Sequence, residues 1–174
     1  QSMSSSVNIE TTPFNQIPKT PQKMTVHIVF AIALAHCLND LIQASLHANY
    51  PLLKENFALS FAQVGLISLV FQITASLLQP WVGFYTDKYP KPYLLPIGMS
   101  VTLCGIVLLA FAPSFAVLLL AAALIGVGSS TFHPEASRVA RLASGGKFGT
   151  AQSAFQVGGN SGSAIGPLLA ATII

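Results

Sequence analysis

The chain has 174 residues, of which 52% are hydrophobic and only 7% are charged, and its mean hydropathy is +0.65. Soluble domains carry roughly 25% charged residues, so this composition excludes a soluble globular enzyme and a disordered chain. Eight Lys and Arg against five Asp and Glu are too few and too scattered to form a surface for nucleic acid. The composition predicts a multi-pass membrane protein embedded in a lipid bilayer.

Residues 1–23 are polar, contain three prolines and show no apolar periodicity, so we expect a disordered tail there. Five apolar segments follow, each near or above the ~20 residues that a helix needs to cross a bilayer. They cover residues 24–53, 60–85, 93–112, 115–140 and 150–174. The runs are continuous rather than alternating, which favours an all-α protein with five transmembrane helices over a β-barrel. Because the last run reaches the final residue without a polar tail, we expect the protein to continue beyond it.

The basic residues indicate the orientation of these spans. Seven of the eight fall in segments that five spans would bring to one side, namely Lys19, Lys23, Lys88, Lys91, Arg138, Arg141 and Lys147. Lys54 is alone on the other side. Since short cytoplasmic loops are enriched in Lys and Arg, we expect a cytoplasmic N-terminus.

The first span carries polar side chains at helical spacing. His36, Asp40, Gln43 and His47 fall on one stripe about 60° wide, and Asn39 flanks it. An ionisable side chain within a span is costly and therefore functional by default, so we predict that Asp40 carries protons, helped by His36 and His47. The alternative is a set of structural hydrogen bonds between helices. The spacing of His36 and Asp40 also suits a metal, but the sequence offers no matching third ligand, so no metal is expected.

The second and fifth spans repeat this pattern. Polar residues on the three stripes are expected to line a shared wet cavity rather than a hydrogen-bonded seam, and the predicted lining is Asn39, Gln43, Gln72, Gln79, Gln156 and Asn160. The fifth span also has Gly158, Gly162 and Gly166 at intervals of four, followed by Pro167. Small residues at this spacing predict close packing of two helices, with a gating bend at Gly166 and Pro167 as the alternative.

The fourth span ends in a polar segment. Glu135 and Arg138 are three residues apart, so they can pair, and we expect them near the inner interface. Proton coupling through Glu135 is the alternative to this ion pair. His133 lies deeper in the span and is a further candidate for proton transfer near neutral pH.

Two motifs resemble those of the major facilitator superfamily. The loop after the second span contains Gly83, Asp87, Lys88 and Lys91 at the spacing of the family's cytoplasmic signature, although Pro90 replaces a glycine. The segment 162–167 is similar to the antiporter motif of the family's exporters. Further runs, at residues 38–43, 76–80, 86–90, 132–141 and 155–160, resemble the fosmidomycin-resistance group of this family.

The resemblance covers residues 27–174. It implies a twelve-span, proton-coupled exporter of a small drug such as fosmidomycin in a bacterial inner membrane. This chain would form helices 1–5 of the N-terminal six-helix half, and a C-terminal half would be missing. The resemblance also implies that Gly83, Asp87, Lys88 and Lys91 form a gate, with Arg138 beside them. Where the family has an arginine before the Gly126-Val-Gly128 segment this chain has Ala122, so His133, Glu135 or Arg138 would take over that role.

Other functions are compatible with the same spans. An importer of a small polar metabolite and a non-transporting membrane sensor are the alternatives. A membrane-embedded enzyme is not expected, because Cys37 and Ser45, the nucleophiles nearest to His36 and Asp40, point to other faces of the helix. No cofactor is predicted, and the expected partners are a small-molecule substrate, protons and lipid.

Overall fold

The computed structural model describes residues 23–91 and 93–173, and their secondary structure is helical throughout. The predicted disordered tail lies outside these residues except for Lys23. The helices are α1 (Val26–Ala48), α2 (Tyr50–Asn56), α3 (Phe61–Gln72), the π-helical segment η1 (Ile73–Leu77), α4 (Leu78–Lys88), α5 (Leu94–Ala110), α6 (Phe115–Leu142) and α7 (Phe148–Ile173). Because α3, η1 and α4 follow one another without a loop, these elements make five spans.

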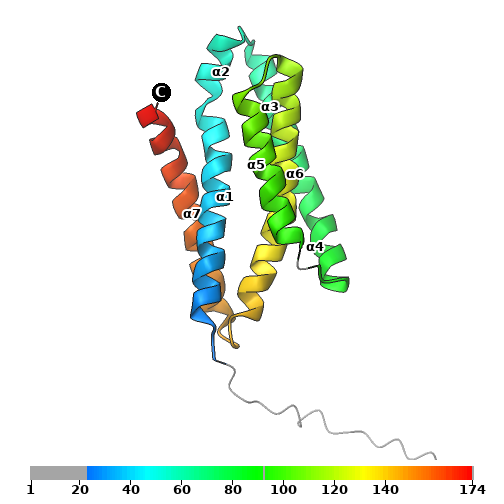
Figure 1. Cartoon of the computed structure of the whole chain (residues 1–174), viewed down its shortest axis with the longest axis vertical. Coiled ribbons are helices and arrows are strands. Elements are labelled where there is room, and N and C mark those ends of the chain that lie inside the picture. The colour runs from blue at the N-terminus through cyan, green and yellow to red at the C-terminus, as the bar shows by residue number, and fades with distance from the viewer. Residues whose placement is uncertain (1–22, 92, 174) are drawn as a thin grey trace, which may run out of the picture.

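The five spans run along one common axis (Figure 1). One end of this bundle holds α2, the start of α3 and the last turn of α7, and we call it the α2 end. The opposite end holds the start of α1 and the ends of α4 and α6. Among the described residues, α1, the continuous segment Phe61–Lys88 and α6 are long and apolar enough to cross a membrane, whereas α5 is apolar but has only 17 residues.

The first two spans differ from the uniform helices that the sequence predicts. The first is divided at Asn49, because Pro51 at the start of α2 has no N–H to bond into α1. The second contains η1, where the Thr74 hydroxyl bonds the carbonyl oxygens of Val70 and Phe71 at 2.9 and 3.0 Å. Pro80 follows and provides no N–H for the preceding turn. Together these residues favour the wider π-turn, a form that is frequent at functional sites.

Short connections hold the spans in an up-and-down order. Ser60 and Gln63 form a reciprocal capping box that begins α3. Gly145 and Gly146, with φ of 57° and 86°, make the tight turn between α6 and α7, where a side chain would be strained.

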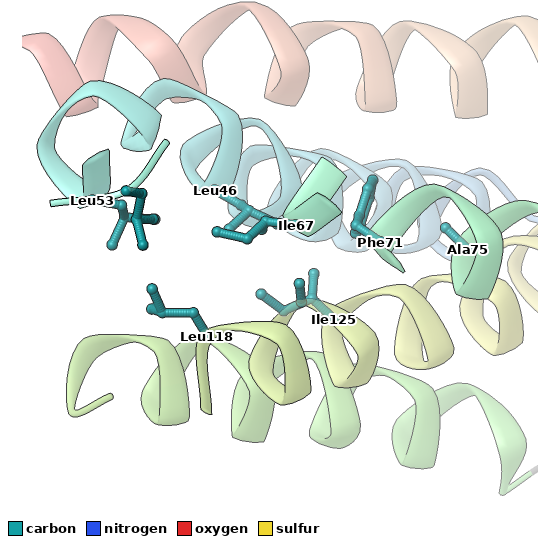
Figure 2. Packing of buried hydrophobic residues seen from close by; sticks show 9 residues of the cluster. Leu46, Leu53, Ile67, Phe71, Ala75, Leu118 and Ile125 are labelled. Atoms are coloured by element: carbon teal, nitrogen blue, oxygen red, sulfur yellow. The ribbon is translucent and has the colours of Figure 1, made fainter. Parts of the chain in front are cut away.

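The largest apolar cluster lies towards the α2 end, between α1, α2, α3, η1 and α6 (Figure 2). It consists of Leu46, Leu53, Leu59, Ile67, Phe71, Ala75, Leu118, Ala122 and Ile125. Leu46, Ile67, Leu118 and Ile125 are completely buried. This cluster packs the first, second and fourth spans against one another at that end of the bundle.

Glycines let two pairs of helices approach closely, α1 with α7 and α5 with α6. A β-carbon on Gly158 or Gly162 of α7 would overlap the carbonyl oxygen of Ala33 or Cys37 in α1. One on Gly166 would lie 2.8 Å from the β-carbon of Ala44. In the other pair, a β-carbon on Gly105 of α5 would lie 2.7 Å from Cγ1 of Ile125. These contacts leave no room for side chains, so α1 and α7 pack backbone to backbone.

Candidate functional site

The carboxylate of Asp40 is the centre of a polar cluster between α1, α6 and α7. Nε2 of His36, one turn earlier on α1, lies 3.3 Å from its Oδ2. Nε2 of His133 on α6 lies 3.2 Å from its Oδ1. The same Oδ1 accepts hydrogen bonds of 3.3 Å from the side-chain amides of Asn39 and Gln43. The fold therefore brings together three of the predicted proton-coupling residues.

Both histidine rings are fixed by backbone carbonyls on their far side. Nδ1–H of His36 donates to the carbonyl oxygen of Phe155 in α7 at 2.8 Å. Nδ1–H of His133 donates to the carbonyl oxygen of Ser129 at 2.9 Å. A carbonyl only accepts, so each Nδ1 must carry a hydrogen. In its neutral form each ring then presents the lone pair of Nε2 to Asp40.

Gln43 and Ser129 close this cluster into a ring of hydrogen bonds. The Ser129 hydroxyl donates to Oε1 of Gln43 at 3.0 Å, and it lies 3.2 Å from Nδ1 of His133. The amide of Gln43 donates in turn to Asp40. The ring thus joins α1 to α6 through two independent side-chain contacts.

Two hollows lie on either side of this cluster. A hollow of about 540 Å³ towards the α2 end is lined by Asp40, Gln43, Ala44, His47, Ala48, Phe71, Ser163 and Pro167. A hollow of about 470 Å³ towards the opposite end is lined by Ser76, Gln79, Pro80, His133, Pro134, Ser137, Phe155 and Gln156. Asp40 therefore faces one hollow and His133 faces the other, while their side chains touch.

The two other polar residues predicted on α1, His47 and Asn39, have surroundings that differ from each other. His47 is exposed, donates to the carbonyl oxygen of Gln43 at 3.0 Å and packs edge-on against Phe71. In the described part of the chain it makes no bond to Asp40. Asn39 is 1% exposed and its Oδ1 is buried without a hydrogen-bond partner among the described residues. Asn39 therefore belongs to the cluster rather than to the surface of a cavity.

The predicted cavity residues on the other spans divide into two groups. Gln79 and Gln156 line the hollow at the opposite end. Gln72 and Asn160 are exposed and are not among the described residues that line either hollow. Of the predicted cavity residues on the second and fifth spans, one from each span therefore lines a hollow together with His133.

The residues of the predicted gate lie at the opposite end. Glu135 is only 1% exposed, and its Oε2 forms an ion pair with Nη2 of Arg138 at 2.7 Å. Asp87, Lys88 and Lys91 are exposed. A β-carbon on Gly83 would lie 3.6 Å from the β-carbon of Pro134, so α4 passes close to α6 there. The described residues include no ion pair of Asp87.

The fold supplies a third possible metal ligand, His133, that the spacing of His36 and Asp40 in the sequence did not offer. Ligand atoms of His36, Asp40 and His133 all lie within 4.8 Å of one another. Two imidazoles and a carboxylate are a donor set that transition metals use. The same three side chains also form a hydrogen-bonded network that can share a proton without a metal. In it, Nδ1 of each histidine bonds a backbone carbonyl and Asp40 accepts hydrogen bonds from two side-chain amides.

Two members of the cluster were not predicted from the sequence. Ser129 lies four residues before His133 on the same helical face, a signal that could have revealed it. The carbonyl oxygen of Phe155 carries no such signal, because any residue type provides one.

The comparisons with known proteins are consistent with this architecture. Residues 32–174 match the family described as Major Facilitator Superfamily. The chain is 62% identical over 155 residues to the fosmidomycin resistance protein of Escherichia coli (strain K12), which covers 89% of this chain and 38% of that protein. It is 49% identical over 159 residues to the uncharacterized MFS-type transporter YfnC of Bacillus subtilis (strain 168), covering 90% of this chain and 39% of the relative.

No solved structure matches the chain. The chain spans less than two fifths of the length of these two relatives. The family match covers most of the chain, and the five-span helical bundle agrees with it. This chain belongs to the Major Facilitator Superfamily.

Proposed function

We propose that this chain is the first part of a proton-coupled exporter of a small drug in a bacterial inner membrane. The observation that carries the proposal is the carboxylate of Asp40, held within a membrane span by two histidines and open to the hollow towards the α2 end. A carboxylate at such a position is costly unless it is used, and proton relays in transporters use this kind of group.

Similarity to a relative supports the proposed substrate class. The relative from Escherichia coli is named for fosmidomycin resistance, and resistance through a membrane transporter requires outward movement of the drug. The chain covers 38% of that protein, so we propose that a second half supplies the facing wall of the substrate cavity. The exposed amides of Gln72, Gln156 and Asn160 are available to that cavity.

Coupling requires that the proton and the substrate affect the same group. The hollow towards the α2 end is lined by Asp40, Gln43 and His47, so a solute that enters it contacts the proton-binding cluster directly. Substrate binding would then favour release of the proton, and proton binding would favour release of the substrate.

Substitution of Asp40 tests the proposal in the intact transporter in proteoliposomes. Asp40→Asn keeps the shape and cannot carry a proton, so we expect loss of fosmidomycin transport driven by a proton gradient, with substrate binding retained. Glu135→Gln is the matched control, because Glu135 pairs with Arg138 and is not among the described residues that line either hollow, and we expect a milder effect. Equal proton-driven transport by wild type and Asp40→Asn would refute the role of Asp40.

We also propose that the end opposite α2 is cytoplasmic. The proposal is supported by the basic residues Lys88, Lys91, Arg141 and Lys147, which belong to segments at that end. A cysteine introduced at position 147 should react with a membrane-impermeant reagent only from the cytoplasmic side. One introduced at position 54 should react from the outside, and the reverse labelling pattern would invert the topology.

A further inference from the structure

We propose that His133 is a second proton carrier, which receives the proton from Asp40 and passes it to the hollow at the opposite end of the bundle. This inference rests on the proposed function, since it assigns the step that follows proton uptake by Asp40. It gives the proton a route through the protein rather than a single binding group.

The first argument is the position of the two side chains. Asp40 lines the hollow towards the α2 end and His133 lines the hollow towards the opposite end. Their contact of 3.2 Å joins the two spaces. A proton that enters by one hollow can therefore reach the other through this pair.

The second argument is the hydrogen-bond inventory of His133. Its Nδ1–H is bound to the carbonyl oxygen of Ser129 at 2.9 Å, so the neutral ring has a lone pair at Nε2. An ionised Asp40 also has only lone pairs, and two acceptors do not bond to each other. The contact therefore holds one proton, on the carboxyl group or on the ring.

The transfer balances with these two groups alone. Protonated Asp40 gives up the hydrogen on Oδ1, and a new N–H bond forms at Nε2 of His133, which leaves a carboxylate and an imidazolium. The imidazolium then releases the Nε2 hydrogen to water in the opposite hollow. The neutral ring that remains still donates from Nδ1 to Ser129, so the cycle can repeat.

The third argument is the contrast with His36, which contacts Asp40 at nearly the same distance. The side chain of His36 is 5% exposed, against 24% for His133, and its ring stacks on Phe155 at 3.9 Å. A β-carbon on Gly159 would overlap the His36 ring. Since His36 is not among the described residues that line either hollow, it positions Asp40 and does not relay the proton.

The titratable groups that face the pair are few. On α1, His36 lies against Asp40, and its ring centroid is 5.0 Å from that of His133. His47, also on α1, lines the hollow that Asp40 faces. On α6, Glu135 is paired with Arg138. Gln79 of α4 and Gln156 of α7, which share the hollow with His133, are neutral. The described residues thus offer His133 as the acceptor between Asp40 and this hollow.

The test measures two activities of the intact transporter in proteoliposomes, fosmidomycin accumulation driven by a proton gradient and fosmidomycin counterflow without a gradient. We expect His133→Gln and His133→Asn to lose accumulation and keep counterflow. His27→Gln is the matched control and should keep both activities, because His27 is exposed at the start of α1 and lines neither hollow.

The possible outcomes separate the proposed function, the relay through His133, a structural role of His133 and a metal site. If wild type shows no proton-driven accumulation, the proposed function itself fails. If wild type is coupled and either His133 variant is coupled equally, the relay is wrong. Loss of counterflow in both His133 variants would make His133 a structural residue and overturn the proposal. Loss of wild-type coupling in EDTA, restored by Zn²⁺, would identify the cluster as a metal site instead.

Discussion

Helix α1 contacts α7 and α6 in opposite ways. Along α7 the contact is backbone to backbone, because Gly158 and Gly162 leave no space for side chains against Ala33 and Cys37. Along α6 the middle of the contact is made by polar side chains flanked by two hollows, and apolar clusters pack the two helices together on either side of it. The difference indicates which interface is fixed and which can change during transport.

The physical reason lies in the number of arrangements that each interface permits. Close-packed backbones have few alternatives, because any shift brings atoms into overlap or opens a void. A hydrogen bond between membrane helices contributes only about 0.6 kcal/mol on average, so it can be exchanged for water in a hollow. We therefore expect α1 and α7 to move together, and the contact of α1 with α6 to open and close as Asp40 and His133 change protonation.

Gly162→Val should break the fixed interface and has the largest expected effect on stability. The added side chain would overlap the carbonyl oxygen of Cys37. Overpacking typically costs about 1–3 kcal/mol, and we expect the upper end of this range because the overlapped atom belongs to the backbone. The measurement is the melting temperature of the intact transporter in detergent, together with the yield of folded protein. Gly149→Ala is the matched control on the same helix, because nothing lies within 4 Å of the added carbon. Equal melting temperatures for the two variants would show that the α1–α7 contact is looser than described.

Gln43→Met should weaken the changeable interface and has a smaller expected effect. Methionine keeps the length of the side chain but removes the hydrogen bond to Ser129 across the interface and the one to Asp40 within α1. At about 0.6 kcal/mol for the bond between helices and about 0.2–0.5 kcal/mol for the one within α1, the loss of stability should be about 1 kcal/mol. The expected functional result is faster exchange between the two states, measured as a higher rate of counterflow. A loss of stability as large as that of Gly162→Val would contradict the distinction between the two interfaces.

The spans themselves were predictable, since each depends on the local apolar content of one segment. The predicted fourth span, 115–140, differs from α6 by two residues at its end. The second was less predictable, because η1 depends on Thr74 bonding within its own helix and on a close approach at Gly126. Gly126 lies in another span, and no local pattern near Thr74 refers to it.

The candidate site was likewise predictable where it depends on one helix and not where it depends on contacts between helices. The stripe on α1 correctly grouped His36, Asp40 and Gln43, which lie on one helical face. It also included His47, which shares that face yet lies too far along the helix to bond Asp40, and instead packs against Phe71. His133 was a separate candidate from α6, and its contact with Asp40 joins residues 93 positions apart.

By itself, the sequence determined that this is an all-α membrane protein, how many spans it has, and which side chains are too costly to be buried without a use. These properties follow from composition and helical periodicity, which are local. Only the tertiary structure decided which of these side chains meet. The glycines of α7 set how near it lies to α1, and the ring from Asp40 through Gln43 and Ser129 to His133 depends on α6 lying beside α1. A proton moves only between atoms in hydrogen-bond contact, so the route is a property of the packed helices.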